Sequence, residues 1–261
     1  MPNQTIWITG ASSGIGEGAA KLFNSKGYNV ILSARNEEAL LKVKKSCAFP
    51  DRCYVLPLDL IDQDSFPSKT TEAIGAFGKI DIMLHNGGIS QRSLIHETTL
   101  AVDRKLMEVN FFGTVGLTKE LLPHFIQNKS GQFGVVTSLV GKFGTQFRSS
   151  YAASKHALHG FFESLRSELF QENISVTMIC PGFIKTNVPI NALTADGSAL
   201  NEMDDAQANG MSPEGCAKAI FKALNSKKEE VYIGGKETYV VYLKRFFPTL
   251  FSKILRKSNV R

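Results

Sequence analysis

The sequence predicts an α/β fold: a single domain with a doubly wound, mostly parallel seven-stranded sheet and helices on both faces. Short apolar runs alternate with longer segments of helical periodicity along the chain, as expected of right-handed strand–helix–strand units. A chain of 261 residues can bury one large core, and no repeat or low-complexity linker divides it. We therefore expect one domain over residues 1–235, followed by a short tail over 236–261.

The apolar runs set the expected strands, which are Gln4–Thr9, Tyr28–Ala34, Cys53–Leu58, Ile80–His85, Gln132–Ser138, Ile174–Ile179 and Val231–Ile233. The expected helices lie between them, over Gly14–Lys26, Glu37–Cys47, Asp64–Phe77, Leu100–Asn128, a segment that carries Tyr151, and Pro213–Ser226. Residues 187–211 form a long polar connection after the sixth strand. By its position, this connection is expected to be a lid over a substrate site.

Composition excludes several classes of protein. Apolar residues make up 43% of the chain and charged residues 21%, which is ordinary for a globular protein. No window approaches the roughly 18–20 uncharged apolar residues that span a bilayer. Because Gln4–Thr9 already reads as a core strand, we expect no secretory signal and a cytoplasmic location.

The four cysteines show no metal-ligand spacing, and we predict no metal site. Cys47 and Cys53 are close enough in sequence to pair across a turn, whereas Cys180 lies in an apolar strand and Cys216 in an expected helix. In a reducing cytoplasm we expect free thiols.

The net charge of +6 comes from the tail. Residues 236–261 carry seven basic side chains against Glu237 alone, so residues 1–235 are formally neutral. No nucleic-acid recognition motif accompanies these basic residues. The basic balance therefore does not indicate a nucleic-acid partner.

A glycine-rich turn, Thr9–Gly16 (TGASSGIG), follows the first expected strand. Glycines let backbone amides approach a pyrophosphate and let a helix begin tightly against the strand, with the phosphate at the helix N-terminus. The spacing differs from G-x-G-x-x-G, and a purely structural turn is the alternative. The position directly after the first strand favours nucleotide binding.

Arg35 ends the second expected strand, where a dinucleotide-binding fold faces the adenosine ribose. An acidic residue there accepts the 2′-hydroxyl, whereas an arginine accommodates a 2′-phosphate. The strand ends Ser33-Ala34-Arg35 without a carboxylate. The alternative is a surface arginine at the head of a helix; the sequence favours NADP(H) over NAD(H).

Polar residues and turn formers recur at the carboxyl ends of the expected strands and on one helix. In open parallel sheets, ligands bind outside these strand ends. Each residue alone has a structural explanation as a turn, a cap or a helix stop. Together they outline one site: Asp59, Asn86, Gly87, Gly88, Asn110, Ser138, Pro181 and Gly182.

Tyr151 and Lys155 lie four residues apart on an expected helix and therefore share one face. A phenol with a free pKa near ~10 is a poor proton donor or acceptor at neutral pH. A neighbouring cation favours the phenolate and lowers that pKa. Tyr-x-x-x-Lys occurs by chance on many helices, so alone it does not indicate a catalytic site. It does so here because the other predicted site residues accompany it along the chain.

Taken together, these motifs resemble the short-chain dehydrogenases/reductases over residues 4 to about 235. Thr9–Gly16 is similar to the family's T-G-x-x-x-G-x-G turn, and Asn86–Gly88 to its N-A-G motif with Gly87 in place of alanine. Within the family, residues 86–92 and 151–160 are most similar to the dehydrogenase/reductase member 7-like group. The resemblance implies a Rossmann fold and a catalytic tetrad of Asn110, Ser138, Tyr151 and Lys155. It implies cofactor contacts at Gly10, Ser12, Ser13, Gly14, Ile15, Gly16, Arg35, Asp59, Leu60, Asn86, Gly87, Gly88, Asn110, Tyr151, Lys155, Pro181, Gly182, Ile184 and Thr186.

The activity that the resemblance implies is NADP(H)-dependent carbonyl reduction or alcohol oxidation by hydride transfer. Tyr151 would exchange the proton, Ser138 would bind the substrate oxygen, and Lys155 would lower the Tyr151 pKa and hold the nicotinamide ribose. Asn110 would anchor a water that links Lys155 to solvent. Ser13 departs from some NADP-dependent members, which carry a second basic residue there. The alternatives are an NADP(H)-binding regulatory protein and a fold-mate acting as an epimerase or dehydratase.

The partners are less well defined by the sequence. By family analogy we expect a lipophilic small-molecule carbonyl or alcohol as substrate, and a homodimer or homotetramer. On a helical wheel the tail has an apolar face of Tyr239, Leu243, Phe246, Phe247, Leu250 and Ile254, with Pro248 as a break or kink. This face either packs on its own domain or a sister subunit, or contacts a membrane peripherally with its cations on anionic lipid. The similarity to membrane-associated members and the positive charge of the tail support the second interpretation, and both interpretations stay open.

Overall fold

The computed structural model describes residues 4–257. A single seven-stranded sheet crosses the molecule in the order β3-β2-β1-β4-β5-β6-β7, and every pair of neighbouring strands is parallel. The predicted α/β fold is confirmed, with a sheet that is parallel throughout. The strands are β1 (Thr5–Thr9), β2 (Asn29–Ser33), β3 (Cys53–Val55), β4 (Ile82–His85), β5 (Gly131–Val136), β6 (Ile174–Pro181) and β7 (Glu230–Ile233).

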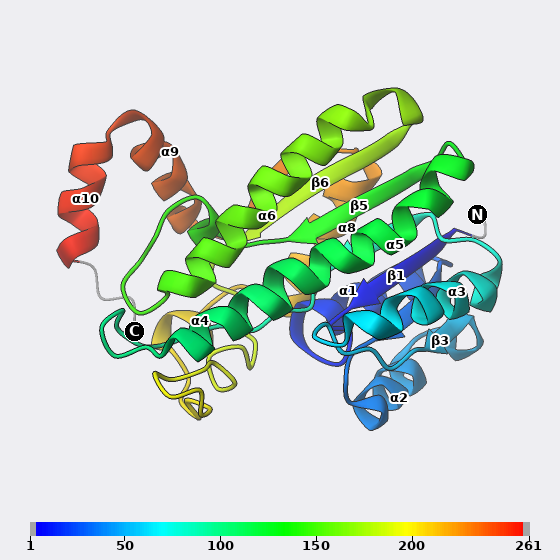
Figure 1. Ribbon diagram of the computed structural model, residues 1–261, viewed down its shortest axis with the longest axis horizontal. Helices are drawn as coiled ribbons and strands as arrows, with labels where there is room; N and C mark the ends of the chain where they lie inside the picture. Colours follow the sequence, from blue (N-terminus) through cyan, green and yellow to red (C-terminus); the bar gives the residue numbers. More distant parts are fainter. Residues whose placement is uncertain (1–3, 258–261) are drawn as a thin grey trace.

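Helices cover both faces of the sheet, because successive strand side chains point in opposite directions. In β1, Ile6 and Ile8 pack under the helices of one face, whereas Trp7 packs under those of the other. The first face carries α1 (Gly14–Ser25), α2 (Glu37–Ser46) and α8 (Pro213–Asn225). The second face, toward the viewer in Figure 1, carries α3 (Phe66–Phe77), α5 (Gly113–Gln127) and α6 (Ser149–Glu168).

The long helical region expected over Leu100–Asn128 is interrupted by a π-helical turn. It consists of α4 (Leu100–Met107), the π turn η3 (Glu108–Phe112) and α5. Such turns widen a helix locally and occur frequently at functional sites. Short elements complete the chain: η1 (Pro50–Arg52), η2 (Gln63–Ser65), η4 (Leu139–Gly141), η5 (Phe170–Glu172), α7 (Asp205–Ala208) and η6 (Lys236–Thr238).

Segment 187–211, called the lid below, is ordered by backbone pairing. The Leu193 amide donates to the Ser90 carbonyl, and the Leu193 carbonyl accepts from the Arg92 amide, both at 2.8 Å. These two hydrogen bonds pair the backbone of the lid with the loop after β4. The Thr99 amide at the start of α4 donates to Ala195 at 3.0 Å. The lid is therefore attached to the loop after β4 and to α4.

The tail folds into two helices, α9 (Tyr239–Phe246) and α10 (Pro248–Lys257). The break expected at Pro248 is present, since this residue begins α10. Val241 and Phe251 are the buried residues of the two helices, and the ring centroids of Phe143 and Phe251 lie 5.4 Å apart. One side of the tail therefore packs on its own domain. Arg261, which contributes to the tail's charge, lies outside the described residues.

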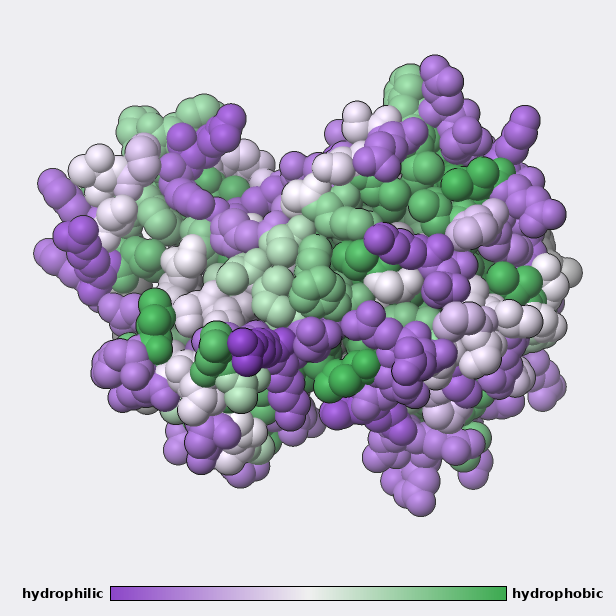
Figure 2. Space-filling view, viewed as in Figure 1, coloured by the Kyte–Doolittle hydropathy of each residue, from purple (hydrophilic) through white to green (hydrophobic). Residues whose placement is uncertain are grey.

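The opposite side of the tail is exposed and apolar, with cations beside it. Its large exposed side chains are Tyr239, Tyr242, Phe246, Phe247, Leu250 and Ile254. Figure 2 shows hydrophobic and hydrophilic side chains interleaved over the region where Figure 1 draws α9 and α10. Within residues 4–257, no helix combines the length and apolar character needed to cross a bilayer.

The four cysteines are free and buried, as expected. Cys47 and Cys53 lie close enough for their thiols to form a hydrogen bond, which lowers the pKa of Cys47 and raises that of Cys53. Burial raises the pKa of Cys180 and of Cys216 to about 12. At neutral pH, Cys180 and Cys216 are thiols packed in the core.

Candidate active site

A cavity of about 1140 Å³ opens at the carboxyl ends of the strands. Figure 1 shows that the strand arrows point toward the end of the molecule that carries the lid (yellow) and the tail (orange to red). The cavity wall includes the glycine-rich turn, the ends of β4, β5 and β6, the lid, and both tail helices. This is the edge at which open parallel sheets bind ligands.

The glycine-rich turn depends on glycine at specific positions. Gly10 and Gly14 have φ values of +64° and +56°, a left-handed conformation that glycine adopts without strain. A Cβ atom on Gly16 would lie 2.2 Å from the carbonyl oxygen of Gly10. The turn therefore packs its backbone tightly at the N-terminus of α1, beside the cavity, and fits the pyrophosphate of a dinucleotide.

Asn86 and Thr9 fix the ends of β1 and β4 relative to each other. The Asn86 side chain donates to the carbonyl oxygens of Thr9 and Gly10, at 3.0 and 3.2 Å. The Thr9 hydroxyl accepts from the amides of Asn86 and Gly87, both at 3.0 Å. A Cβ on Gly87 would lie 2.9 Å from Leu60, so the glycine that replaces the family's alanine sits in a tight space.

Arg35 and Asp59 line the cavity beyond the ends of β2 and β3. Arg35 is exposed, lines the cavity, and has no hydrogen bond or ion pair with the described part of the chain. Its neighbour Asn36 caps α2 by accepting from the Ala39 amide at 3.0 Å. Asp59 accepts from the Ile61 amide at 3.1 Å. The guanidinium of Arg35 is thus available to an anion in the cavity.

Asn110 lies in the π turn and is fully buried. Its side-chain oxygen accepts from the Ile89 amide at 2.8 Å, and its side-chain nitrogen donates to the Ile89 carbonyl and the Ser154 hydroxyl, both at 3.0 Å. Asn110 therefore joins the loop after β4 to the helix that carries Tyr151. Its side chain stands behind the cavity wall and does not line the cavity.

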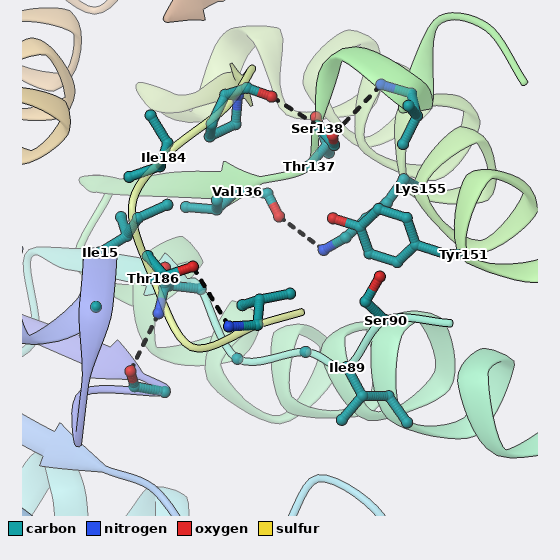
Figure 3. Close-up of a pocket in the computed structure, with 18 of the residues that line it drawn as sticks. Ile15, Ile89, Ser90, Val136, Thr137, Ser138, Tyr151, Lys155, Ile184 and Thr186 are labelled. Atoms are coloured by element: carbon teal, nitrogen blue, oxygen red, sulfur yellow. Dashed lines mark hydrogen bonds between the residues drawn. The ribbon is translucent and has the colours of Figure 1, made fainter. Parts of the chain in front are cut away.

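Tyr151, Ser138 and Lys155 meet inside the cavity, where Figure 3 shows the Tyr151 ring between Ser138 and Ser90. The Ser138 hydroxyl lies 3.4 Å from the Pro181 carbonyl oxygen and accepts from the Val140 amide at 3.3 Å. The buried Lys155 ammonium donates to the Val136 carbonyl at 2.9 Å. A phenol, a hydroxyl and an ammonium therefore converge from α6 and the end of β5.

The electrostatics of Tyr151 differ from the sequence expectation. Burial raises the pKa of the phenol, while a hydrogen bond from Ser138 and the charges of Arg92 and Arg148 lower it. The predicted effect of Lys155 is not among these influences. Burial lowers the pKa of Lys155 itself to about 8, which weakens its charge near neutral pH. In the protein without a cofactor, the positive charges of Arg92 and Arg148 lower the Tyr151 pKa, which is the effect that the sequence assigned to Lys155.

Most of the predicted site residues line this one cavity. The exceptions are Asn110, described above, and Gly16, whose hydrogen faces the turn. The predicted residues that line it are Gly10, Ser12, Ser13, Gly14, Ile15, Arg35, Asp59, Leu60, Asn86, Gly87, Gly88, Ser138, Tyr151, Lys155, Pro181, Gly182, Ile184 and Thr186.

Two groups of wall residues were not predicted. Arg92 and Arg148 line the cavity and share the lid residue Asp204. The tail contributes an apolar wall of Val240, Leu243, Phe251, Ile254 and Leu255. The sequence indicated that the tail was apolar on one face, but that pattern does not identify the surface it covers.

One cluster outside the cavity has metal-ligand side chains. His159, Glu163 and Glu230 place their ligand atoms within 4.8 Å of one another. The Lys142 ammonium lies 2.6 Å from the Glu230 carboxylate and 3.8 Å from that of Glu163. A lysine thus supplies positive charge to this cluster.

Comparisons with known proteins agree with the fold. The family model described as short chain dehydrogenase matches residues 4–196. The chain is 39% identical to a dehydrogenase/reductase SDR family protein 7-like of Drosophila melanogaster, covering 100% of this chain and 82% of that protein. It is 39% identical to SDR family member 7B of Mus musculus, covering 98% and 81%. A short-chain dehydrogenase from Streptomyces avermitilis superposes with a TM-score of 0.82 at 27% identity, over 99% of this chain and 100% of that one.

The protein belongs to the short-chain dehydrogenase/reductase family, whose members are oxidoreductases that bind a nicotinamide cofactor and act on small molecules. A Burkholderia phymatum member of this fold, crystallised in complex with NAD, superposes with a TM-score of 0.84 at 18% identity, over 100% of this chain and 98% of that one. The glycine-rich turn, with its left-handed Gly10 and Gly14, fits a dinucleotide.

Proposed function

We propose that the protein is an NADP(H)-dependent oxidoreductase that interconverts a lipophilic carbonyl compound and its alcohol, with Tyr151 as general acid and base. The observation that carries this proposal is the convergence of Tyr151, Ser138 and Lys155 with the glycine-rich turn in one cavity. The bound cofactor supplies the hydride or accepts it. The protein's own side chains transfer the proton and bind the substrate oxygen.

The proposed roles follow from the contacts of each side chain. In reduction the Tyr151 phenol protonates the substrate oxygen, and burial supports this role because it keeps the phenol protonated at neutral pH. The Ser138 hydroxyl binds the same oxygen, where negative charge develops. In oxidation Tyr151 takes the hydroxyl proton. The Lys155 ammonium is proposed to bind the ribose next to the nicotinamide, in exchange for its bond to Val136.

Asn110 is proposed to hold the loop after β4 in place, in addition to the water-binding role considered above. Its side chain is occupied by Ile89 and Ser154, so a water on the path from Lys155 would bind elsewhere on this residue. This arrangement supports a positioning role for the amide. An alanine at this position would leave the Ile89 amide without its partner.

Preference for NADP(H) rests on Arg35. Its side chain is exposed, lines the cavity beyond β2, and has no carboxylate bound to it within the described residues. A guanidinium recognises a phosphate through paired hydrogen bonds. A 2′-phosphate is therefore the proposed partner of Arg35.

The lipophilic substrate class is supported by the part of the cavity furthest from the glycine-rich turn. There the walls come from Phe143 and from Val240, Leu243, Phe251 and Leu255 of the tail helices. Apolar walls favour an apolar ligand body, with the few polar groups fixing its orientation. Ser138 and Tyr151 are the polar groups proposed to fix the carbonyl oxygen.

We also propose that the exposed side of α9 and α10 binds an anionic membrane surface. Phe246, Phe247 and Leu250 offer an apolar contact, and Arg245 and Lys253 lie beside it. Interfacial helices combine these features, an apolar face and cations that meet lipid headgroups. The expected cytoplasmic location and homo-oligomeric state stay predictions.

A panel of ketones and alcohols tests the proposed activity, with NADPH and NADP⁺ compared against NADH and NAD⁺. Oxidation of the reduced cofactor is followed by absorbance, and Tyr151→Phe is the matched control. We expect ketone-dependent consumption of NADPH that Tyr151→Phe abolishes. NADPH binding without turnover would favour a regulatory protein. Product formation without net cofactor consumption would favour an epimerase or dehydratase.

A further inference from the structure

Three buried charged residues connect the lid to the catalytic helix. Arg92 lies in the loop after β4, Arg148 precedes α6 by one residue, and Asp204 belongs to the lid. Their exposed fractions are 4%, 6% and 6%. They are far apart in sequence, since Asp204 is 112 residues from Arg92 and 56 from Arg148. Only the fold brings them together.

One carboxylate serves both guanidiniums. Asp204 Oδ2 accepts from Arg92 Nη2 at 2.6 Å, from Arg92 Nε at 3.0 Å, and from Arg148 Nη2 at 3.0 Å. Arg92 also donates to the Ser90 hydroxyl and the Gln91 carbonyl, both at 2.7 Å. The arginines hold the pKa of Asp204 below its usual range despite the opposing effect of burial. The carboxylate is therefore ionised at neutral pH.

Two guanidiniums at the cavity wall share the Asp204 carboxylate of the lid. Tyr151 lies three residues after Arg148, one helical turn further along the same chain segment. Arg92 and Arg148 both lower the pKa of the Tyr151 phenol. The phenol therefore lies in the field of a charged group whose counterion belongs to the lid.

Other charged groups surround the same cavity. Lys155 approaches from the helix of Tyr151 itself, with its Nζ atom 5.8 Å from the ring centroid. Lys105 of α4 and Glu237 of η6 also line the cavity, and Asp103 of α4 accepts a hydrogen bond from Ser150. Burial lowers the pKa of Lys155, and Cys180 of β6 opposes this effect in part. None of these groups belongs to the lid, so Asp204 is the charge that lid movement would take away from the arginines.

We propose that Arg92, Arg148 and Asp204 form an ionic clamp that holds the lid closed over Tyr151 and couples lid position to proton transfer by the phenol. The proposal deepens the oxidoreductase function proposed above and rests on it. All three are positioning residues, since they act on the reaction through Tyr151 and the lid. Withdrawal of Asp204 would take from the buried Arg92 guanidinium the carboxylate that it binds at 2.6 Å, which is strongly unfavourable and favours the closed lid.

The clamp predicts opposite effects from removing opposite charges. Asp204→Asn keeps the size of the side chain and removes its negative charge, so the phenolate of Tyr151 becomes more favourable. Arg148→Met keeps much of the side-chain length and removes a positive charge, so the phenolate becomes less favourable. A purely structural role for the clamp would not move the phenol pKa in opposite directions.

The test is an absorbance titration of the Tyr151 phenolate in the full chain, taken as the difference between each protein and the same protein carrying Tyr151→Phe. We expect Asp204→Asn to lower the apparent pKa and Arg148→Met to raise it, each by about one pH unit, which is a tenfold change in phenolate fraction. Asp204→Glu and Arg148→Lys keep the charges and should leave the value within about a third of those shifts. Shifts in the same direction, or no shift in either variant, would overturn the electrostatic part of the proposal.

Limited proteolysis provides a second readout, of the lid itself. Cleavage within residues 187–211 should be faster in Asp204→Asn and in Arg92→Met than in the parent, at matched thermal stability. Parent-like cleavage in both variants would overturn the clamp. Neither readout requires turnover. If no carbonyl substrate were reduced by the parent, the proposed function would fail while the titration and the proteolysis still decided the clamp.

Discussion

The Nζ atom of Lys155 lies 5.8 Å from the centroid of the Tyr151 ring and donates its hydrogen bond to the Val136 carbonyl at 2.9 Å. The hydrogen bond that the structure gives this ammonium is therefore to the backbone of β5. Burial lowers the pKa of Lys155 to about 8, and burial also raises the pKa of Tyr151. At neutral pH the phenol is therefore protonated, and Lys155 stays mostly an ammonium although burial weakens its hold on the proton.

Tyr151→Phe should abolish turnover and leave NADPH binding nearly intact, because the ring remains and only the proton donor is lost. We expect a fall in kcat of at least about 100-fold, and a dissociation constant for NADPH within about threefold of the parent value. Steady-state kinetics and calorimetry measure the two quantities. Tyr54→Phe, which removes a hydroxyl bonded to Glu72 outside the cavity, is the control. Parent-like turnover in Tyr151→Phe would eliminate the mechanism.

Arg35→Asp should reverse the cofactor preference. The new carboxylate repels a 2′-phosphate and can accept the ribose 2′-hydroxyl of NAD(H). We expect the ratio of the Michaelis constants for NADPH and NADH to rise by roughly 100-fold, which corresponds to the loss of a charge-assisted phosphate contact. Lys42→Asp makes the same charge change on an exposed position of α2, outside the cavity wall, and should leave the ratio unchanged. An unchanged ratio in Arg35→Asp would mean that Arg35 only faces solvent.

The buried His85 should make the protein acid-sensitive. Burial lowers the pKa of His85 to about 3, and its Nδ1 atom has no hydrogen-bond partner among residues 4–257. Because the folded pKa lies below the unfolded value of roughly 6.5, the unfolded state binds the proton first as the pH falls. The stability contributed by neutral His85 is therefore complete above pH ~6.5 and is lost progressively from there toward pH ~3.

Denaturant unfolding at pH 7 and pH 5 measures this loss. In the parent, the free energy of unfolding should be lower at pH 5 than at pH 7, and His85→Asn should make this difference smaller by about 2 kcal/mol. Any destabilisation by the substitution that is the same at both pH values does not affect the comparison. His96→Asn removes an exposed histidine and should retain the parental fall. An identical pH dependence in His85→Asn and the parent would contradict the assignment of acid sensitivity to His85.

The exposed side of the tail should bind anionic vesicles. Full-length protein is expected to co-sediment with them, less so at high salt, because the contact combines apolar burial with screened charges. Phe246→Ser with Phe247→Ser should abolish co-sedimentation, and Arg245→Gln should weaken it about fivefold. These point variants are preferable to truncation before Tyr239, since truncation would remove Phe251 from Phe143.

Phe170→Ser is the control for this experiment, because Phe170 is a phenylalanine with 84% exposure outside the tail. It should co-sediment as the parent does. If the Phe246 and Phe247 variant co-sedimented equally well, or if the parent did not sediment at all, the exposed side of the tail would be a contact with another subunit.

The sequence determined the fold because the signals for it are local. The two-residue alternation in β1 assigns Ile6 and Ile8 to one face of the sheet and Trp7 to the other, and the structure buries each of them there. The glycine-rich turn was equally readable, since left-handed backbone at Gly10 and Gly14 requires glycine. The four-residue spacing of Tyr151 and Lys155 placed both on one face of α6.

Tertiary structure decided the electrostatics of the site and the surface that the tail covers. The direction of the Tyr151 pKa depends on burial and on Arg92 and Arg148, and the Arg92–Asp204 contact joins residues 112 positions apart. The tail's apolar pattern did not distinguish Phe251, which faces the cavity, from Phe246, which is exposed. Burial and long-range contact are properties of the packed chain, because neighbours in space set the dielectric and the charge around each group. Local sequence therefore identified the candidate residues for the chemistry. Packing set the pKa values of these residues and decided which side chains form the wall of the cavity around them.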